Sequence, residues 1–191
     1  FGLQVSDDGT AYSRCGVYRL DQDGGYGDSY LIGAGEPYQL TFGLFDPVIA
    51  TGEPAFRALV QRYDYYDSII ELLSFDSSGV IESTIPVLTT LPSDSTLVGF
   101  RQLRQTVDGG FVFCGFHDTP DSHPKALLVK LDTNGTVQWQ QTYDAPGQSY
   151  VAISVAQYVD GGYVLAGYRL PESVPNLGFL IRTDSIGNQI W

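Results

Sequence analysis

Hydrophobic residues occur along this chain in short runs that are separated by Gly, Asp, Asn and Pro. Near the C-terminus, residues 152–158 alternate between apolar and polar, 163–168 and 178–183 are apolar, and 189–191 begin another run. Short runs rich in Val, Ile, Leu and aromatic residues between turn-forming residues predict β-strands. No stretch combines a helical apolar period with capping residues. The pattern therefore predicts an all-β fold.

The strongest pattern is an internal repeat with a spacing of 52 residues. Residues 108–139 align without a gap to residues 160–191. The identical pairs are Asp108/Asp160, Gly109/Gly161, Gly110/Gly162, Val112/Val164, Gly115/Gly167, Leu128/Leu180, Asp132/Asp184, Gly135/Gly187 and Trp139/Trp191. A weaker copy lies upstream, and the first 45 residues hold a degenerate one. We expect a degenerate unit at 1–45, complete units at 46–96 and 97–148, and a partial unit at 149–191.

Each unit is expected to form four antiparallel strands. The Asp-Gly-Gly element would join the first two strands and Asp-x-x-Gly the last two, because Gly accepts positive φ and Asp hydrogen-bonds its own turn. A sheet with an uncovered apolar face is not stable alone, so neighbouring units must stack as a solenoid or a propeller. Four-stranded units of about 50 residues favour the β-propeller.

The pattern DGGYVLAGY…FLIRTDSIGNQIW resembles the repeats of secreted β-propeller proteins of Bacteroidetes-type bacteria. The resemblance covers residues 97–191 and is weaker before them. It implies a secreted or cell-surface location, export by type IX secretion, and no shared catalytic residues. We therefore expect an incomplete propeller whose partners are other blades of the same longer chain. The lack of any methionine agrees with a processed or partial chain.

The net charge of the chain limits the classes of partner that it can bind. Ten basic and 22 acidic residues give a net charge of −12, which repels nucleic-acid phosphates and anionic membranes. No apolar run is long enough to span a membrane. A protein or a glycan is the expected partner. Two cysteines, Cys15 and Cys114, are too few for a disulfide framework, so we expect free thiols.

Binding is expected at one end of the sheets. In an up-and-down sheet the first and third connections share one end, and the longer, more variable connections share the other, where ligands usually bind. Aromatic rings there could stack on sugars or anchor a protein, and His with carboxylates could hold zinc. Blade-edge packing and ordinary solvated loops are the alternatives. The candidate ligand-binding residues are Tyr63, Tyr65, Tyr66, His117, Asp118, Asp121, His123, Tyr143 and Tyr150.

A second candidate site is a calcium loop formed by Asp21, Asp23 and Asp28, with an acidic turn as the alternative. No other cofactor is expected. The sequence contains no Gly-x-Ser-x-Gly element, phosphate loop or nucleophilic Cys–His motif. We therefore expect a non-enzymatic, extracytoplasmic binding or structural module. A propeller enzyme acting on glycans or peptides at the loop end, and a metal-stabilised structural array, are the alternatives.

Overall fold

The structure is a computed structural model. It describes residues 2–5, 11–20, 26–32, 39–42, 56–63, 68–75, 81–90, 98–118, 123–171 and 176–191. Before residue 56 it describes the backbone of the strands alone. Every regular element in these segments is a β-strand, as the sequence predicted. Within these segments there is no helix that could cross a membrane.

The strands follow the predicted apolar runs and extend several of them. Their bounds are β1 Gly2–Val5, β2 Ala11–Leu20, β3 Tyr26–Ile32, β4 Gln39–Phe42, β5 Phe56–Tyr63, β6 Ser68–Phe75, β7 Ile81–Thr90, β8 Val98–Gln105, β9 Phe111–His117, β10 Lys125–Leu131, β11 Val137–Tyr143, β12 Gln148–Gln157, β13 Tyr163–Pro171 and β14 Leu177–Arg182.

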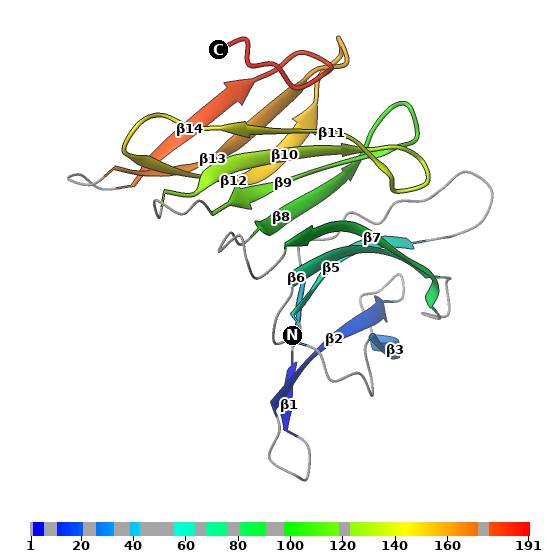
Figure 1. Ribbon diagram of the computed structural model, residues 1–191. Coiled ribbons are helices and arrows are strands. Elements are labelled where there is room, and N and C mark those ends of the chain that lie inside the picture. Colours follow the sequence, from blue (N-terminus) through cyan, green and yellow to red (C-terminus); the bar gives the residue numbers. More distant parts are fainter. Residues whose placement is uncertain are drawn as a thin grey trace.

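These strands form four antiparallel sheets, β1–β3, β4–β7, β8–β11 and β12–β14. Within each sheet, strands that are consecutive in sequence are neighbours, and the sheets follow one another in sequence order (Figure 1). The third sheet extends from Val98 to Tyr143, and the fourth extends from Gln148 to Arg182. The second sheet begins earlier than its expected boundary at residue 46, because β4 pairs with β5.

The tight turns form as their sequence predicts. Gly109 and Gly161 have φ values of 80° and 87° between the first and second strands of their sheets. The Asp108 carboxylate accepts a hydrogen bond from the Gly110 N–H at 3.0 Å, and Asp160 accepts the equivalent bond from Gly162. Positive φ is costly for residues with a Cβ, so glycine at these two positions fixes the turn.

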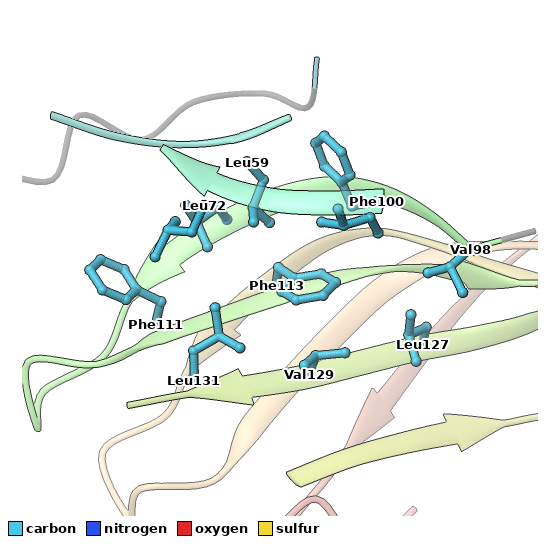
Figure 2. Close-up of a cluster of buried hydrophobic side chains, with 11 residues drawn as sticks. Leu59, Leu72, Val98, Phe100, Phe111, Phe113, Leu127, Val129 and Leu131 are labelled. Atoms are coloured by element: carbon cyan, nitrogen blue, oxygen red, sulfur yellow. The ribbon is translucent and has the colours of Figure 1, made fainter. Parts of the chain in front are cut away.

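The sheet β8–β11 is buried on both faces. Successive residues of a strand point to opposite faces, so alternate residues of β9 and β10 enter different apolar clusters. Phe113, Leu127 and Val129 pack toward the preceding sheet, against Leu59 and Leu72 (Figure 2). Burial on both sides explains why β9 and β10 are continuous apolar runs rather than alternating ones.

The opposite face of the same sheet packs on the last sheet. Val112, Cys114 and Leu128 meet Val155 and Leu165 there, and all five are fully or almost fully buried. Cys114 is a free thiol, as expected, and burial raises its pKa to about 12. Cys15 lies in β2, where side chains are not described. The sheets therefore hold together by face-to-face burial of apolar side chains.

Truncating a side chain between the second and third sheets tests this packing. Phe113→Ala should lower the free energy of unfolding by about 3–5 kcal/mol, because a fully buried ring leaves a cavity. Chemical denaturation measures the change. The control, Val107→Ala, removes an apolar side chain that is 90% exposed and should change stability by about 0.5 kcal/mol or less. Equal effects of the two substitutions would contradict the packing.

Candidate functional site

The two ends of the sheets carry different connections, as the up-and-down topology predicts. His117 pairs with both Val98 and Lys125, so the β9–β10 connection and the start of β8 share one end. Gln148 pairs with Pro171 at the same end of the last sheet. We call this the loop end. The tight turns after β8, β10, β12 and β14 lie at the opposite end, which we call the turn end.

The loop end contains a crevice of about 270 Å³ between the last two sheets, which we call the loop-end crevice. Residues from the ends or edges of β11, β12, β13 and β14 line it, so sheet packing fixes its shape. The lining residues are Tyr143, Asp144, Tyr150, Arg169, Gly178, Phe179, Leu180, Ile181 and Gln189. Two of the predicted ligand-binding residues, Tyr143 and Tyr150, are thereby brought together.

The two tyrosines of the loop-end crevice differ in burial and in hydrogen bonding. Tyr150 is half-buried, and its ring lies 5.3 Å from that of Phe179, tilted by 51°. Tyr143, the last residue of β11, is buried, and its hydroxyl donates a hydrogen bond to the Gly187 carbonyl at 2.7 Å. Burial, with the charge of Asp184, raises the pKa of Tyr143. Tyr150 is the aromatic side chain of this pair that a ligand can reach.

Charged groups of the loop-end crevice form weak surface pairs. The Asp144 carboxylate lies 2.7 Å from Lys125 Nζ, and its side chain is 46% exposed. Arg169 donates a hydrogen bond to the Gln148 side chain at 2.9 Å. Solvated pairs of this kind contribute little to stability, so a ligand can exchange for them at low cost.

The histidine-containing loop is described in part. His117, Asp118 and His123 are half-buried near the loop end. Burial raises the pKa of Asp118, and the charge of His117 opposes that shift. Within the described segments no three His, Cys, Asp or Glu side chains are grouped to hold a metal ion.

The remaining candidates fall where side chains are not described. Tyr63 ends β5 and Asp28 lies in β3, and for both only the backbone is described. Outside the described residues lie Tyr65, Tyr66 and Asp121 of the binding prediction and Asp21 and Asp23 of the calcium prediction. The calcium hypothesis thus stays a prediction.

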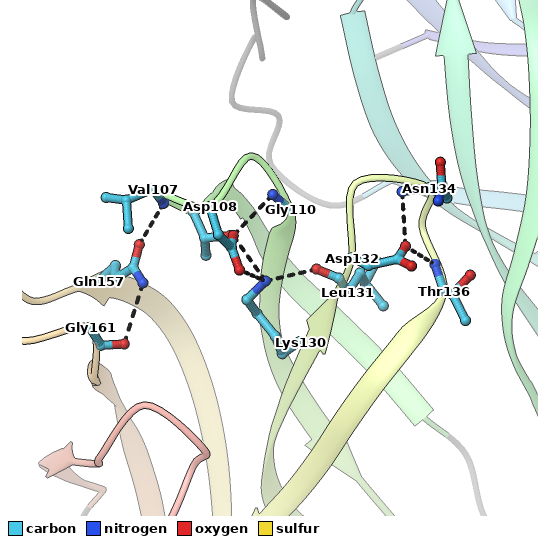
Figure 3. Close-up of polar contacts among 11 residues, drawn as sticks. Val107, Asp108, Gly110, Lys130, Leu131, Asp132, Asn134, Thr136, Gln157 and Gly161 are labelled. Atoms are coloured by element: carbon cyan, nitrogen blue, oxygen red, sulfur yellow. Dashed lines mark hydrogen bonds and ion pairs between the residues drawn. The ribbon is translucent and has the colours of Figure 1, made fainter.

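A second crevice, at the turn end, was missed by reasoning from sequence. It encloses about 510 Å³ between Trp139, Tyr163 and the tight turns. The rings of Trp139 and Tyr163 meet edge-on at 5.7 Å, which agrees with a packing role for this repeated Trp. Gln157 bridges the two sheets by accepting the Val107 N–H at 2.8 Å and donating to the Gly161 carbonyl (Figure 3).

The buried side chain of Lys130 lines the turn-end crevice. Lys130 is 3% exposed, and its Nζ lies 2.8 Å from Asp108 and donates to the Leu131 carbonyl at 2.9 Å (Figure 3). Arg182 and Asp160, one repeat later, form the same pair, and the guanidinium lies 4.5 Å from the Tyr158 ring centroid. Since protein groups already satisfy the polar atoms of Lys130 and Gln157, this end has a structural role. The repeated Asp with Lys or Arg was the sequence signal that could have revealed it.

The ion pair between Asp108 and Lys130 makes the stability of the fold depend on pH. Burial raises the pKa of Asp108, but hydrogen bonds from Lys130, Thr106 and the Gly110 N–H, with the Lys130 charge, outweigh it and lower the pKa to about 2. A carboxyl whose pKa is lowered by folding stabilises the fold above its unfolded pKa. This contribution should therefore be lost as the pH falls from about 4 to about 2.

Asp108→Asn should remove that part of the pH dependence. It should also lower the free energy of unfolding at pH 7 by about 1–3 kcal/mol, because Lys130 stays buried without its ionic partner. Denaturation between pH 2 and 7 measures both effects. The control, Asp144→Asn, removes an exposed pair and should cost about 1 kcal/mol or less. An unchanged pH profile in Asp108→Asn would contradict the assignment.

Comparison with known proteins does not assign this chain to a family. The chain matches no protein-family model and no curated protein.

Proposed function

We propose that this chain is a non-enzymatic, extracytoplasmic binding module built as successive blades of a β-propeller. Its loop end binds a protein or a glycan, and its turn end holds the blades together. The observation that carries this proposal is the loop-end crevice, where an accessible tyrosine and exchangeable charged pairs adjoin a strand edge.

The architecture supports the propeller interpretation. Each described sheet is an up-and-down antiparallel meander, and the β8–β11 sheet buries one face against the sheet before it and the other against the sheet after it. Hydrogen bonds between sheets add to this packing, because the Gln102 side chain accepts bonds from the Ser154 hydroxyl at 2.8 Å and the Val155 N–H at 2.9 Å. Radial stacking of such units is how a propeller covers its sheet faces.

The distribution of charge interactions supports binding at the loop end. At the turn end, the lowered pKa values of Asp108, Asp160 and Asp184 are explained by hydrogen bonds within their turns and to Lys130, Arg182 and Asn188. At the loop end, Asp144 forms a solvated ion pair with Lys125, and Arg169 forms a half-buried hydrogen bond with Gln148. Aromatic residues and arginine are the side chains that most often anchor a binding interface.

Binding should depend on Tyr150 and Arg169. The labelled chain is applied to an array of glycans and to an array of peptides, and the best ligand is titrated against variants. Tyr150→Ala and Arg169→Ala should each weaken binding about tenfold, the effect of losing about 1.4 kcal/mol.

Val107→Ala is the matched control, because Val107 is an exposed apolar residue at the turn end. It should leave the affinity unchanged. Loss of binding in Val107→Ala, or full affinity in both loop-end variants, would refute the assignment of the site.

A further inference from the structure

A row of three polar side chains crosses the sheet β4–β7 beside its apolar core. Arg57 of β5 lies directly opposite Ser74 of β6, and Ser74 lies opposite Ser83 of β7. Residues that face each other in antiparallel strands share one face of the sheet, with Cβ atoms about 5 Å apart. The three side chains therefore form one group, which we call the Arg57 row.

The Arg57 row lies on the face that the third sheet covers. Two residues along each strand, and so on the same face, Leu59, Leu72 and Ile85 pack in the apolar cluster shared with β8–β10 (Figure 2). A Cβ placed on Gly135 would meet Cδ2 of Leu72 at 2.9 Å, so the turn between β10 and β11 lies against these apolar residues. The Arg57 row is thus at the boundary between the second and third sheets, beside the turn end.

The equivalent row of the third sheet has a different composition. There Val112, Lys130 and Trp139 face one another across the second, third and fourth strands of the sheet. Lys130 carries the positive charge of that row, and its Nζ lies 2.8 Å from the Asp108 carboxylate. In the second sheet the positive charge belongs to Arg57, on the second strand instead of the third, and serines occupy the other two positions.

One donor of the Arg57 guanidinium is unused within the described segments. The Nε atom of Arg57 is buried and has no hydrogen-bond partner there. Ser74, directly beside it, is only 3% exposed, so water has little access to this part of the row. A buried N–H group without an acceptor costs free energy, and the cost is larger for a charged donor. The position of Arg57 therefore favours an acceptor that binds at the row.

A guanidinium beside two hydroxyl groups suits an anion with several oxygen atoms. Guanidinium groups bind carboxylates and phosphates through parallel N–H bonds, and serine hydroxyls are further donors. We infer that Arg57, Ser74 and Ser83 form an oxyanion-binding site at the boundary between the second and third sheets. None of these residues lines the loop-end crevice, so the inference does not rest on the proposed binding function.

The oxyanion can come from two sources. One source is the solution, which supplies inorganic phosphate or a small carboxylate. The other is a carboxylate of the chain itself, because Glu53 is the third residue before β5 as Asp108 is the third residue before β9. Glu53 lies outside the described residues. Both sources share the chemistry of an oxyanion held by Arg57, and the experiments below distinguish them.

The first test is a titration of the full chain with sodium phosphate, followed by NMR of the Arg57 Nε–H group. Sodium chloride at matched ionic strength is the reference, because salt screens the surface charges of any protein. Phosphate that binds at the row should shift the Nε–H signal in a saturable way and slow its exchange with water several-fold. Ser74→Ala and Ser83→Ala should each weaken phosphate binding about tenfold.

Arg104→Gln is the matched control, because it removes an equal charge from an exposed position of β8. It should leave the phosphate affinity unchanged, whereas Arg57→Gln should abolish binding, measured in both variants from the Ser74 amide signal. Equal loss of binding in the two variants would show a general effect of net charge and would overturn the inference.

Glu53→Gln distinguishes the two sources. If the carboxylate of the chain occupies the site, the unaltered chain should not respond to phosphate and the Glu53→Gln chain should bind it. The stability losses of Glu53→Gln and Arg57→Gln should then be strongly non-additive in a double-mutant cycle. If the anion comes from solution, both chains should bind phosphate with equal affinity.

The result that would exclude the site is a failure in both arms. If neither the unaltered chain nor Glu53→Gln responds to phosphate, and the two stability losses are additive, Arg57 does not hold an oxyanion. That result would leave the loop-end function standing, because ligand binding at Tyr150 and Arg169 is measured separately.

Discussion

An apolar sheet face in this protein can be removed from water only by the neighbouring sheet. The sheet β8–β11 depends on this constraint most clearly, because Phe113 and Val129 pack on one side and Leu128 and Val112 on the other. Side-chain burial of this kind is the main favourable contribution to folding. Both crevices lie between the third and fourth sheets, one at each end of this packing.

The two ends of this stack carry different side-chain contacts. At the turn end, short connections bring Asp108 to Lys130 and Asp160 to Arg182, and these pairs leave few polar atoms free for a ligand. At the loop end, the Tyr150 ring lies against Phe179, and Arg169 donates a hydrogen bond to Gln148. The same sheets therefore carry ion pairs with a buried cation at one end and half-buried aromatic and polar contacts at the other.

Local features could be predicted from the sequence, and contacts between sheets could not. The strands and the turns at Gly109 and Gly161 depend on neighbouring residues, so the repeat predicted them. The burial of Tyr143 depends on Gly187, which lies in the turn that follows β14. The pairing of β4 with β5 also escaped prediction, because little of the repeat pattern remains there.

The hydrogen bonds that join successive sheets suggest how such a protein can change in evolution. Gln102 binds residues 154 and 155, and Gln157 binds Val107, so the third and fourth sheets are joined by bonds between residues that lie 50 to 53 positions apart. Duplication or loss of one whole 52-residue unit would keep repeat-equivalent positions opposite each other at the new junction. An insertion of any other length inside a strand would misalign them. Gene rearrangements that preserve the period are therefore the ones that this architecture tolerates.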